Sequence, residues 1–152
     1  NGNKVLLNQN LVSEFGEVAC GPTSCAMILI DKGKAANISH LAKQANLKVS
    51  DGGTRVTGLA KALQENGLSN SRFQLGATID DLATATSKGD PAIALMKLKN
   101  ANHHVVVDGV TSRAGQKVVA IRDPNGGRQF FTPIQEFLDK FSGQVVFTNS
   151  IK

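Results

Sequence analysis

The pattern of hydrophobic and polar positions changes its period near residue 90. Before that point apolar residues recur at helical spacing, and we expect helices over 20–33, 37–45, 54–65 and 78–87. After it come short apolar runs rich in Val and Ile, and we expect a further helix over 133–141 and strands over 91–98, 103–110, 117–122, 128–131 and 144–148, in addition to an early strand over 4–7. Helices first and an antiparallel meander afterwards indicate an α+β fold.

The predicted helix over 20–33 is apolar on nearly every face. Pro22 suits its first turn and Gly33 its end, and residues 26–30 between them are all apolar. A helix on the surface would carry a polar stripe. We therefore expect this helix to lie buried at the centre of the domain.

Composition narrows the class of protein. A chain of 152 residues with 41% hydrophobic and 19% charged residues is typical of one globular domain and excludes a disordered chain or a coiled coil. No apolar run approaches the roughly 18 residues of a membrane span. Because the chain starts at Asn1 and not at Met, we expect it to be cut from a longer protein.

The net charge of +5 permits binding to nucleic acid or to an anionic membrane. The lysines and arginines are scattered, however, and no cluster of them is interleaved with aromatic residues. The densest basic stretch, over 113–122, is expected to face solvent. Nucleic acid binding is therefore left without support.

The two cysteines, Cys20 and Cys25, lie five residues apart on one predicted helix. Helical geometry separates their Cα atoms by roughly 8.6 Å, which is beyond the roughly 7 Å limit for a disulfide. A zinc site would need a second pair of ligands, so we expect neither a metal nor another cofactor. Cys25 has apolar neighbours and is expected in the core. Cys20 stands at the helix start, where the helix dipole stabilises a thiolate.

A thiolate nucleophile needs a base, and the base needs an orienting group. Among the three histidines, His40 is expected on the surface, and strand alternation directs only one of His103 and His104 toward a site. Asp108 and Asp123 are the candidate orienting carboxylates, and the turn after Asp123 would hold it at the edge of the next strand. These residues predict a Cys/His/Asp constellation.

Three motifs in order carry a resemblance to a known family: Cys20-Gly-Pro-Thr-Ser-Cys-Ala-Met-Ile-Leu29, His103-His-Val-Val-Val-Asp-Gly-Val110 and Asp123-Pro-Asn-Gly-Gly127. Over residues 9–147 the chain resembles the C39-like branch of the papain-like cysteine peptidases. The resemblance implies that residues 1–152 form a single papain-like domain. Its N-terminal helices, with a buried central helix, would pack on a C-terminal twisted antiparallel sheet.

The resemblance also implies roles for individual residues. Cys20 matches the nucleophile, His103 the base and Asp123 the third member. Gln9 is the nearest match to the glutamine that stabilises the oxyanion, with Asn8 or Asn10 as alternatives. Beside them, Gly21 and His104 are expected to contact the substrate.

Several functions are compatible with such a domain. Our first expectation is a cysteine peptidase-like hydrolase that attacks an amide bond of a peptide or protein. The alternatives are a toxin domain of a bacterial polymorphic or contact-dependent growth inhibition system, acting on a side-chain amide or RNA and recognised by a cognate immunity protein, and a silent peptide-binding module. We expect secretion or delivery as part of a larger bacterial protein that acts in a reducing cytosol, and we rank the cytoplasmic domain of a transporter below this.

Overall fold

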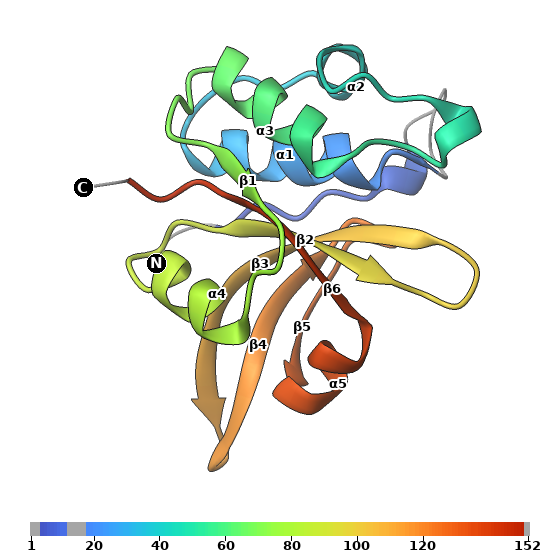
Figure 1. The fold of residues 1–152 in the computed structure, drawn as a ribbon. Helices are drawn as coiled ribbons and strands as arrows, with labels where there is room; N and C mark the ends of the chain where they lie inside the picture. The colour runs from blue at the N-terminus through green and yellow to red at the C-terminus, as the bar shows by residue number, and fades with distance from the viewer. Residues whose placement is uncertain (1–3, 12–17, 151–152) are drawn as a thin grey trace.

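A computed structural model describes residues 4–11 and 18–150 of the chain. Its helices are α1 (Cys20–Asp31), α2 (Ile38–Gln44), α3 (Val56–Glu65), α4 (Ile79–Thr86) and α5 (Ile134–Lys140), with short 3-10 turns η1 (Gln9–Leu11) and η3 (Val49–Asp51). Its strands are β1 (Arg72–Gln74), β2 (Ala92–Lys97), β3 (Asn102–Arg113), β4 (Gln116–Asp123), β5 (Arg128–Pro133) and β6 (Phe141–Phe147). Helices α1, α2 and α3 form one layer above the sheet (Figure 1). The predicted α+β fold is confirmed.

The described strands form one antiparallel sheet in the order β1-β6-β2-β3-β4-β5. The meander predicted for the four strands between residues 91 and 131 is confirmed as β2 to β5. The last strand, β6, returns to pair with β2 and with β1. Strand β1 was not predicted, since a three-residue segment with two polar side chains gives no periodic pattern. The strand predicted over 4–7 is wrong: this segment is not in a ladder.

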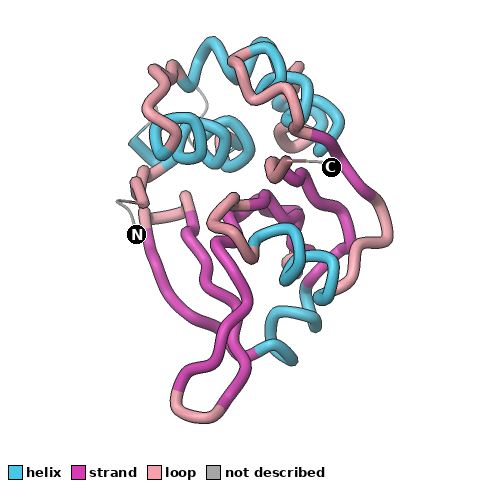
Figure 2. Tube along the Cα trace, turned by 90° about the vertical axis from the view of Figure 1, so that its left-hand side faces the viewer, coloured by secondary structure: helices cyan, strands magenta, loops and turns pink. Residues whose placement is uncertain are grey.

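Two apolar cores lie on opposite faces of the sheet. The core under α1 to α3 includes Ile93, Leu95 and Val106, and the core on the far face, toward α4 and α5, includes Val105 and Val107. Successive residues of β2 and β3 thus enter different cores, as the pleat of a strand requires. Figure 2 shows the helix layer above the strands and the β3–β4 hairpin extending away from it.

Helix α1 is buried over its first ten residues, as its lack of a polar stripe predicted. It packs against α2, α3 and the sheet at once. The starts of two other helices, α2 and α4, are capped by the side chains that precede them. The Asn37 side chain accepts from the N–H of His40, and Thr78 forms a reciprocal capping box with Asp81.

Arg122 corrects the expectation that residues 113–122 face solvent, because its side chain is fully buried. Its guanidinium donates to Asp31 at 2.7 Å, to Asp108 at 2.8 Å and to the carbonyl of Val5 at 2.8 Å. The N–H of Val5 also donates to Asp31, at 2.8 Å. These bonds satisfy the backbone of Val5 without a strand, and they tie the end of α1 to the sheet.

We expect Arg122→Ala to lower the free energy of unfolding by about 3–5 kcal/mol, because it leaves two carboxylates packed together without their cation. Urea unfolding measures this loss. The matched control is Lys117→Ala, an exposed position on the same strand, where we expect a change within about 0.5 kcal/mol. Equal midpoints for the two variants would show that the buried cluster does not stabilise the fold.

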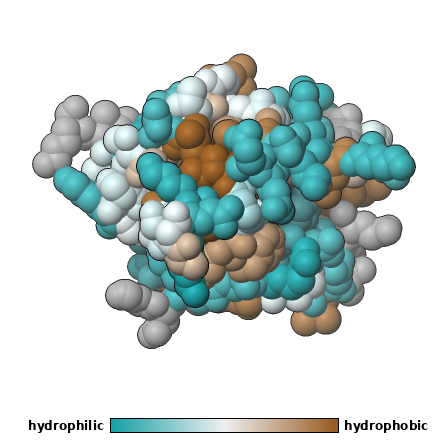
Figure 3. Space-filling model, turned by 90° about the horizontal axis from the view of Figure 1, so that it is seen from below, coloured by the Kyte–Doolittle hydropathy of each residue, from teal (hydrophilic) through white to brown (hydrophobic). Residues whose placement is uncertain are grey.

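The surface of the lower half, away from α1 to α3, is not uniformly polar. Phe130, Phe131 and Leu138 are exposed on β5 and α5. The view from below shows hydrophobic side chains among hydrophilic ones (Figure 3). No helix in the described residues is long and apolar enough to span a membrane.

Candidate functional site

Cys20 is the first residue of α1 and only 6% exposed. Its sulfur lies beside the start of β3. The backbone N–H of His104 donates to Sγ at 3.4 Å, and Nδ1 of the His104 ring lies 3.7 Å from the same sulfur. The N-terminal end of the helix adds a favourable field for negative charge on this atom. The sulfur is thus placed where a thiolate is stabilised from two directions.

His103 and His104 point to opposite faces of β3, as strand alternation predicted. His104 shares the face of Val106 under α1, and His103 shares the face of Val105. The β3–β4 ladder begins only at Val106 and Arg122, so the backbone at residues 103–104 is open for Cys20 on this side. Because the sulfur lies beside the backbone and not above one face, both rings interact with it.

His103 is joined to Asp123 by a short contact of 2.6 Å between Nε2 and Oδ1. Asp123 ends β4, on the same face as His103, and is 6% exposed. The same Oδ1 accepts from the N–H of Asn125 at 2.8 Å, and Oδ2 accepts from Arg128 at 2.9 Å. The turn after β4 therefore fixes the carboxylate that holds the His103 ring.

The charges of Cys20, His103 and Asp123 support one another. Burial of the thiol, the largest influence, raises the pKa of Cys20, but interactions with His103 and His104 outweigh it and lower this pKa to about 5. Burial likewise lowers the pKa of His103, while Asp123 and Cys20 raise it to about 9. The pKa of Asp123 is lowered, because His103, Asn125 and Arg128 outweigh its burial. Near pH 7 the arrangement favours thiolate, imidazolium and carboxylate together.

Gln9 is buried, at 3% exposed, in η1. Its N–H donates at 2.8 Å to the carbonyl of Pro124, the residue after Asp123. The alternatives Asn8 and Asn10 instead bond the same turn with their side chains, through the N–H of Gly126 and the side chain of Asn125. Of these three residues, only Gln9 is buried next to the Asp123 turn.

The remaining sequence candidates fall outside this group. Cys25 is a free thiol, fully buried in the core, and burial raises its pKa. Asp108 binds Arg122, and His40 is exposed. Gly21 lies close to α3: a Cβ there would fall 2.1 Å from Oγ1 of Thr54, so its missing side chain makes room for packing against the segment before α3.

A hollow of about 480 Å³ opens on the His104 side of Cys20. Its walls come from the start of α3, from β1 and its following loop, and from β2, β3 and β6; besides Cys20 and His104 they include Arg55, Thr57, Phe73, Leu75, Leu95, Asn102 and Gln144. His103 and Asp123 line a second hollow of about 260 Å³ on the far face. Apart from Cys20 and His104, the residues that line the hollow beside Cys20 were not predicted from the sequence, because they lie on separate elements and form no motif.

The fold resembles solved peptidase domains. The peptidase domain of Streptococcus ComA, described as a bi-functional ABC transporter, aligns with a TM-score of 0.71 at 17% identity, over 97% of this chain and all of that one. A C39-like peptidase from Bacillus anthracis aligns with a TM-score of 0.71 at 18% identity, over 99% and 96% of the two chains. The peptidase domain of Streptococcus mutans ComA aligns with a TM-score of 0.60 at 18% identity, over 95% and 98%. No curated protein matches the chain.

These neighbours correct the expected localisation. We expected a secreted or delivered protein and ranked a transporter domain lower. Two of the neighbouring structures are peptidase domains of ComA, and the Streptococcus protein is itself described as an ABC transporter. The ranking was wrong because the motifs around Cys20, His103 and Asp123 describe a catalytic domain and contain no information about the protein that carries it.

Family membership follows from a match over almost the whole chain. The model of the peptidase C39 family matches residues 8–152, a range that contains Gln9, Cys20, His103 and Asp123. The resemblance expected from the three motifs is thereby confirmed. The chain belongs to the peptidase C39 family and is a cysteine peptidase-like hydrolase.

Proposed function

We propose that this protein hydrolyses a peptide bond in a peptide or protein, with Cys20 as nucleophile, His103 as acid and base, and Asp123 as the residue that orients His103. The observation that carries the proposal is a buried thiol at a helix start, with the His104 ring 3.7 Å from it and an interaction with His103, whose ring makes a 2.6 Å bond to the buried Asp123 carboxylate. Family membership supports peptidase activity, and the roles of Cys20, His103 and Asp123 are assigned from this geometry.

The first half of the reaction forms an acyl-enzyme. The Cys20 thiolate attacks the carbonyl carbon, and the carbonyl oxygen becomes an oxyanion. The N–H of Cys20 and the side-chain amide of Gln9 are the proposed donors to that oxygen. As the C–N bond breaks, His103 gives its proton to the leaving amine, and a thioester remains on Cys20.

The second half returns the enzyme to its starting state. His103, now neutral, takes a proton from water, and the hydroxide attacks the thioester. The C–S bond breaks, the acid product leaves, and Cys20 is again a thiolate beside the imidazolium. Asp123 stays ionised throughout, since its pKa is lowered. Its bond to Nε2 keeps the other ring nitrogen of His103 available for the reaction.

His104 has a different place in this proposal. Its backbone N–H stabilises the sulfur, and its ring borders the hollow on the substrate side. Nε2 of the ring is buried and has no hydrogen-bond partner among the described residues. A ring without a carboxylate partner is not oriented as His103 is, so we assign His104 to the wall of the site.

The hollow beside Cys20 supports a peptide as substrate. Phe73 and Leu75 offer partly exposed apolar surface along one wall, at 47% and 63% exposed, while Asn102 and Gln144 provide amides on the other strands. An extended peptide needs this combination of apolar contacts and hydrogen-bonding groups. The match over residues 8–152 also supports the chain as a single peptidase domain.

The test is digestion of a mixed library of synthetic peptides, followed by mass spectrometry of the products. We expect new free termini at a restricted set of sequences. Release of ammonia from glutamine or asparagine side chains, with all peptide bonds intact, would contradict the proposed peptidase activity and indicate a deamidase. The toxin and silent-binding alternatives stay predictions, and the bond between His103 and Asp123, together with the lowered pKa of Cys20, weighs against the silent module.

A further inference from the structure

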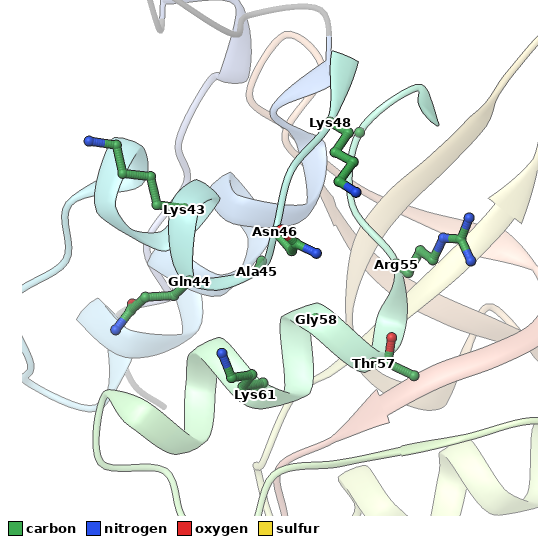
Figure 4. A pocket seen from close by; sticks show the side chains of 10 residues that line it. Lys43, Gln44, Ala45, Asn46, Lys48, Arg55, Thr57, Gly58 and Lys61 are labelled. Atoms are coloured by element: carbon green, nitrogen blue, oxygen red, sulfur yellow. The ribbon is translucent and has the colours of Figure 1, made fainter. Parts of the chain in front are cut away.

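Another hollow lies away from the catalytic residues, between the end of α2 and α3. It has a volume of about 680 Å³ and is lined by four cationic side chains, Lys43, Lys48, Arg55 and Lys61. They come from α2, the loop after it, the residue before α3 and α3 itself (Figure 4). The other described lining residues are Gln44, Ala45, Asn46, Gly53, Thr57 and Gly58, so no acidic residue is found among the described residues of the lining. We call this hollow the basic basin.

Most of this positive charge is not neutralised within the described residues. Lys61 lies 3.5 Å from Glu65, one turn along α3, and both side chains are largely solvent-exposed. Lys43, Lys48 and Arg55 form no ion pair with the described part of the chain. Several cations without an acidic partner among the described residues, gathered around one concave surface, raise the local concentration of anionic groups.

The basin has a floor built from backbone. Gly58 approaches the end of α2 so closely that a Cβ there would lie 2.2 Å from the carbonyl oxygen of Ala45. The loop that follows α2 is closed by two backbone hydrogen bonds between Lys48 and Gly53, each 3.0 Å long. The backbone that carries the cations is therefore held in place, although their side chains are exposed.

The basin adjoins the hollow beside Cys20. Arg55 and Thr57 line both, and the neighbouring residues Gly52 and Gly53 line one each. A chain lying in the hollow beside Cys20 can therefore continue past Arg55 into the basin. This continuity is what separates the basin from an ordinary basic surface.

We propose that the basic basin binds an acidic segment of the peptide substrate, some residues away from the bond that Cys20 cleaves. The proposal rests on the proposed peptidase function and deepens it, since it names the chemistry that selects the substrate. Charge complementarity favours carboxylate side chains. A single-stranded nucleic acid is less well suited, because such sites stack bases on aromatic rings and the described residues of the basin lining include no aromatic one.

The test measures binding first, so that it does not depend on catalysis. Fluorescein-labelled hexaglutamate and hexaglutamine are titrated with the full chain carrying Cys20→Ala, and fluorescence anisotropy is recorded at low and at physiological salt. We expect hexaglutamate to bind about tenfold more tightly than hexaglutamine, from several exposed charge pairs acting together, and to weaken with salt.

A matched pair of triple variants locates the site. Lys43→Gln, Lys48→Gln and Arg55→Gln together should abolish the preference for hexaglutamate. The control combines Lys88→Gln, Arg113→Gln and Lys117→Gln, which removes the same number of exposed cations elsewhere, and should change the affinity less than about twofold. Equal losses of affinity for hexaglutamate in the two triple variants would overturn the proposal. It would also be overturned if labelled hexauridylate bound more tightly than hexaglutamate and lost this affinity in the first triple variant.

Cleavage then tests whether the bound segment belongs to the substrate. A peptide cleaved in the library is extended at either end with four glutamates or four glutamines. We expect glutamates at one of the two ends to raise kcat/KM about tenfold. This gain should disappear in the triple variant of Lys43, Lys48 and Arg55 and remain in the control triple variant. Equal kcat/KM for all four extensions would overturn the assignment to substrate. Absence of any cleavage would contradict the proposed function, while the anisotropy would still decide whether the basin binds acidic peptides.

Discussion

Replacing Cys20 with alanine is expected to abolish peptide cleavage, with a loss in kcat/KM on the order of 10⁵-fold. The reaction proposed here passes through a thioester on this sulfur, and the other thiol, Cys25, is fully buried with a raised pKa. Among the described residues we therefore assign no second nucleophile to this site. The measurement is kcat/KM for a peptide identified in the library.

The matched control for this variant is Cys25→Ala. Cys25 lies on the same helix and donates at 3.9 Å to the carbonyl of Leu59 in α3, so its loss affects packing and not chemistry. We expect Cys25→Ala to retain activity within about twofold and to lose about 1 kcal/mol of stability. Far-UV circular dichroism and urea unfolding check that Cys20→Ala remains folded. An active and folded Cys20→Ala protein would contradict the assignment of the nucleophile.

Replacing His103 with alanine is expected to lower kcat/KM by about 10³- to 10⁴-fold, because the leaving amine loses its proton donor and water its base. His104→Phe fills a similar volume and keeps the backbone N–H that contacts Cys20. It also removes a buried ring nitrogen that has no partner in the described part of the chain. We therefore expect His104→Phe to retain activity within about tenfold.

The pair of histidine variants separates the two rings that contact the thiol. Asp123→Asn belongs to the same series, since Asp123 contacts His103 and not His104. It should lower kcat/KM in the wild-type background and have little further effect in the His103→Ala background. A larger loss in His104→Phe than in His103→Ala would assign the base to His104.

The sequence alone was sufficient for the parts of the site that depend on local pattern. Cys20 precedes an apolar run, and strand alternation separates His103 from His104, so the helix start and the two faces of β3 could be predicted. The interaction of the sulfur with both histidines could not be predicted, because it depends on where α1 crosses the end of β3 and on where the β3–β4 ladder begins.

Buried charge was the other feature that local pattern missed. Arg122 stands in a stretch with other basic residues and was expected in solvent, yet its partners Asp31 and Asp108 come from α1 and β3. The basic basin escaped prediction for the same reason. Its cations are scattered from residue 43 to residue 61, and only the approach of α2 to α3 gathers them around one hollow.

The pH dependence of catalysis follows from the two shifted groups. Below about pH 5 the Cys20 thiolate is protonated, and above about pH 9 the His103 imidazolium loses its proton. Peptide cleavage needs both charged forms, so it should be maximal between these limits. Alkylation of Cys20 needs only the thiolate and should persist above pH 9.

The rate of alkylation of Cys20 by iodoacetamide as a function of pH tests the central claim most directly, with peptide mapping to distinguish Cys20 from Cys25. We predict a rate that is half-maximal near pH 5, falls about tenfold for each unit below that pH, and stays nearly constant to pH 9. In His103→Ala the midpoint should move to higher pH. A wild-type midpoint near the ordinary thiol value of about 8.5 would contradict an activated thiolate–imidazolium pair.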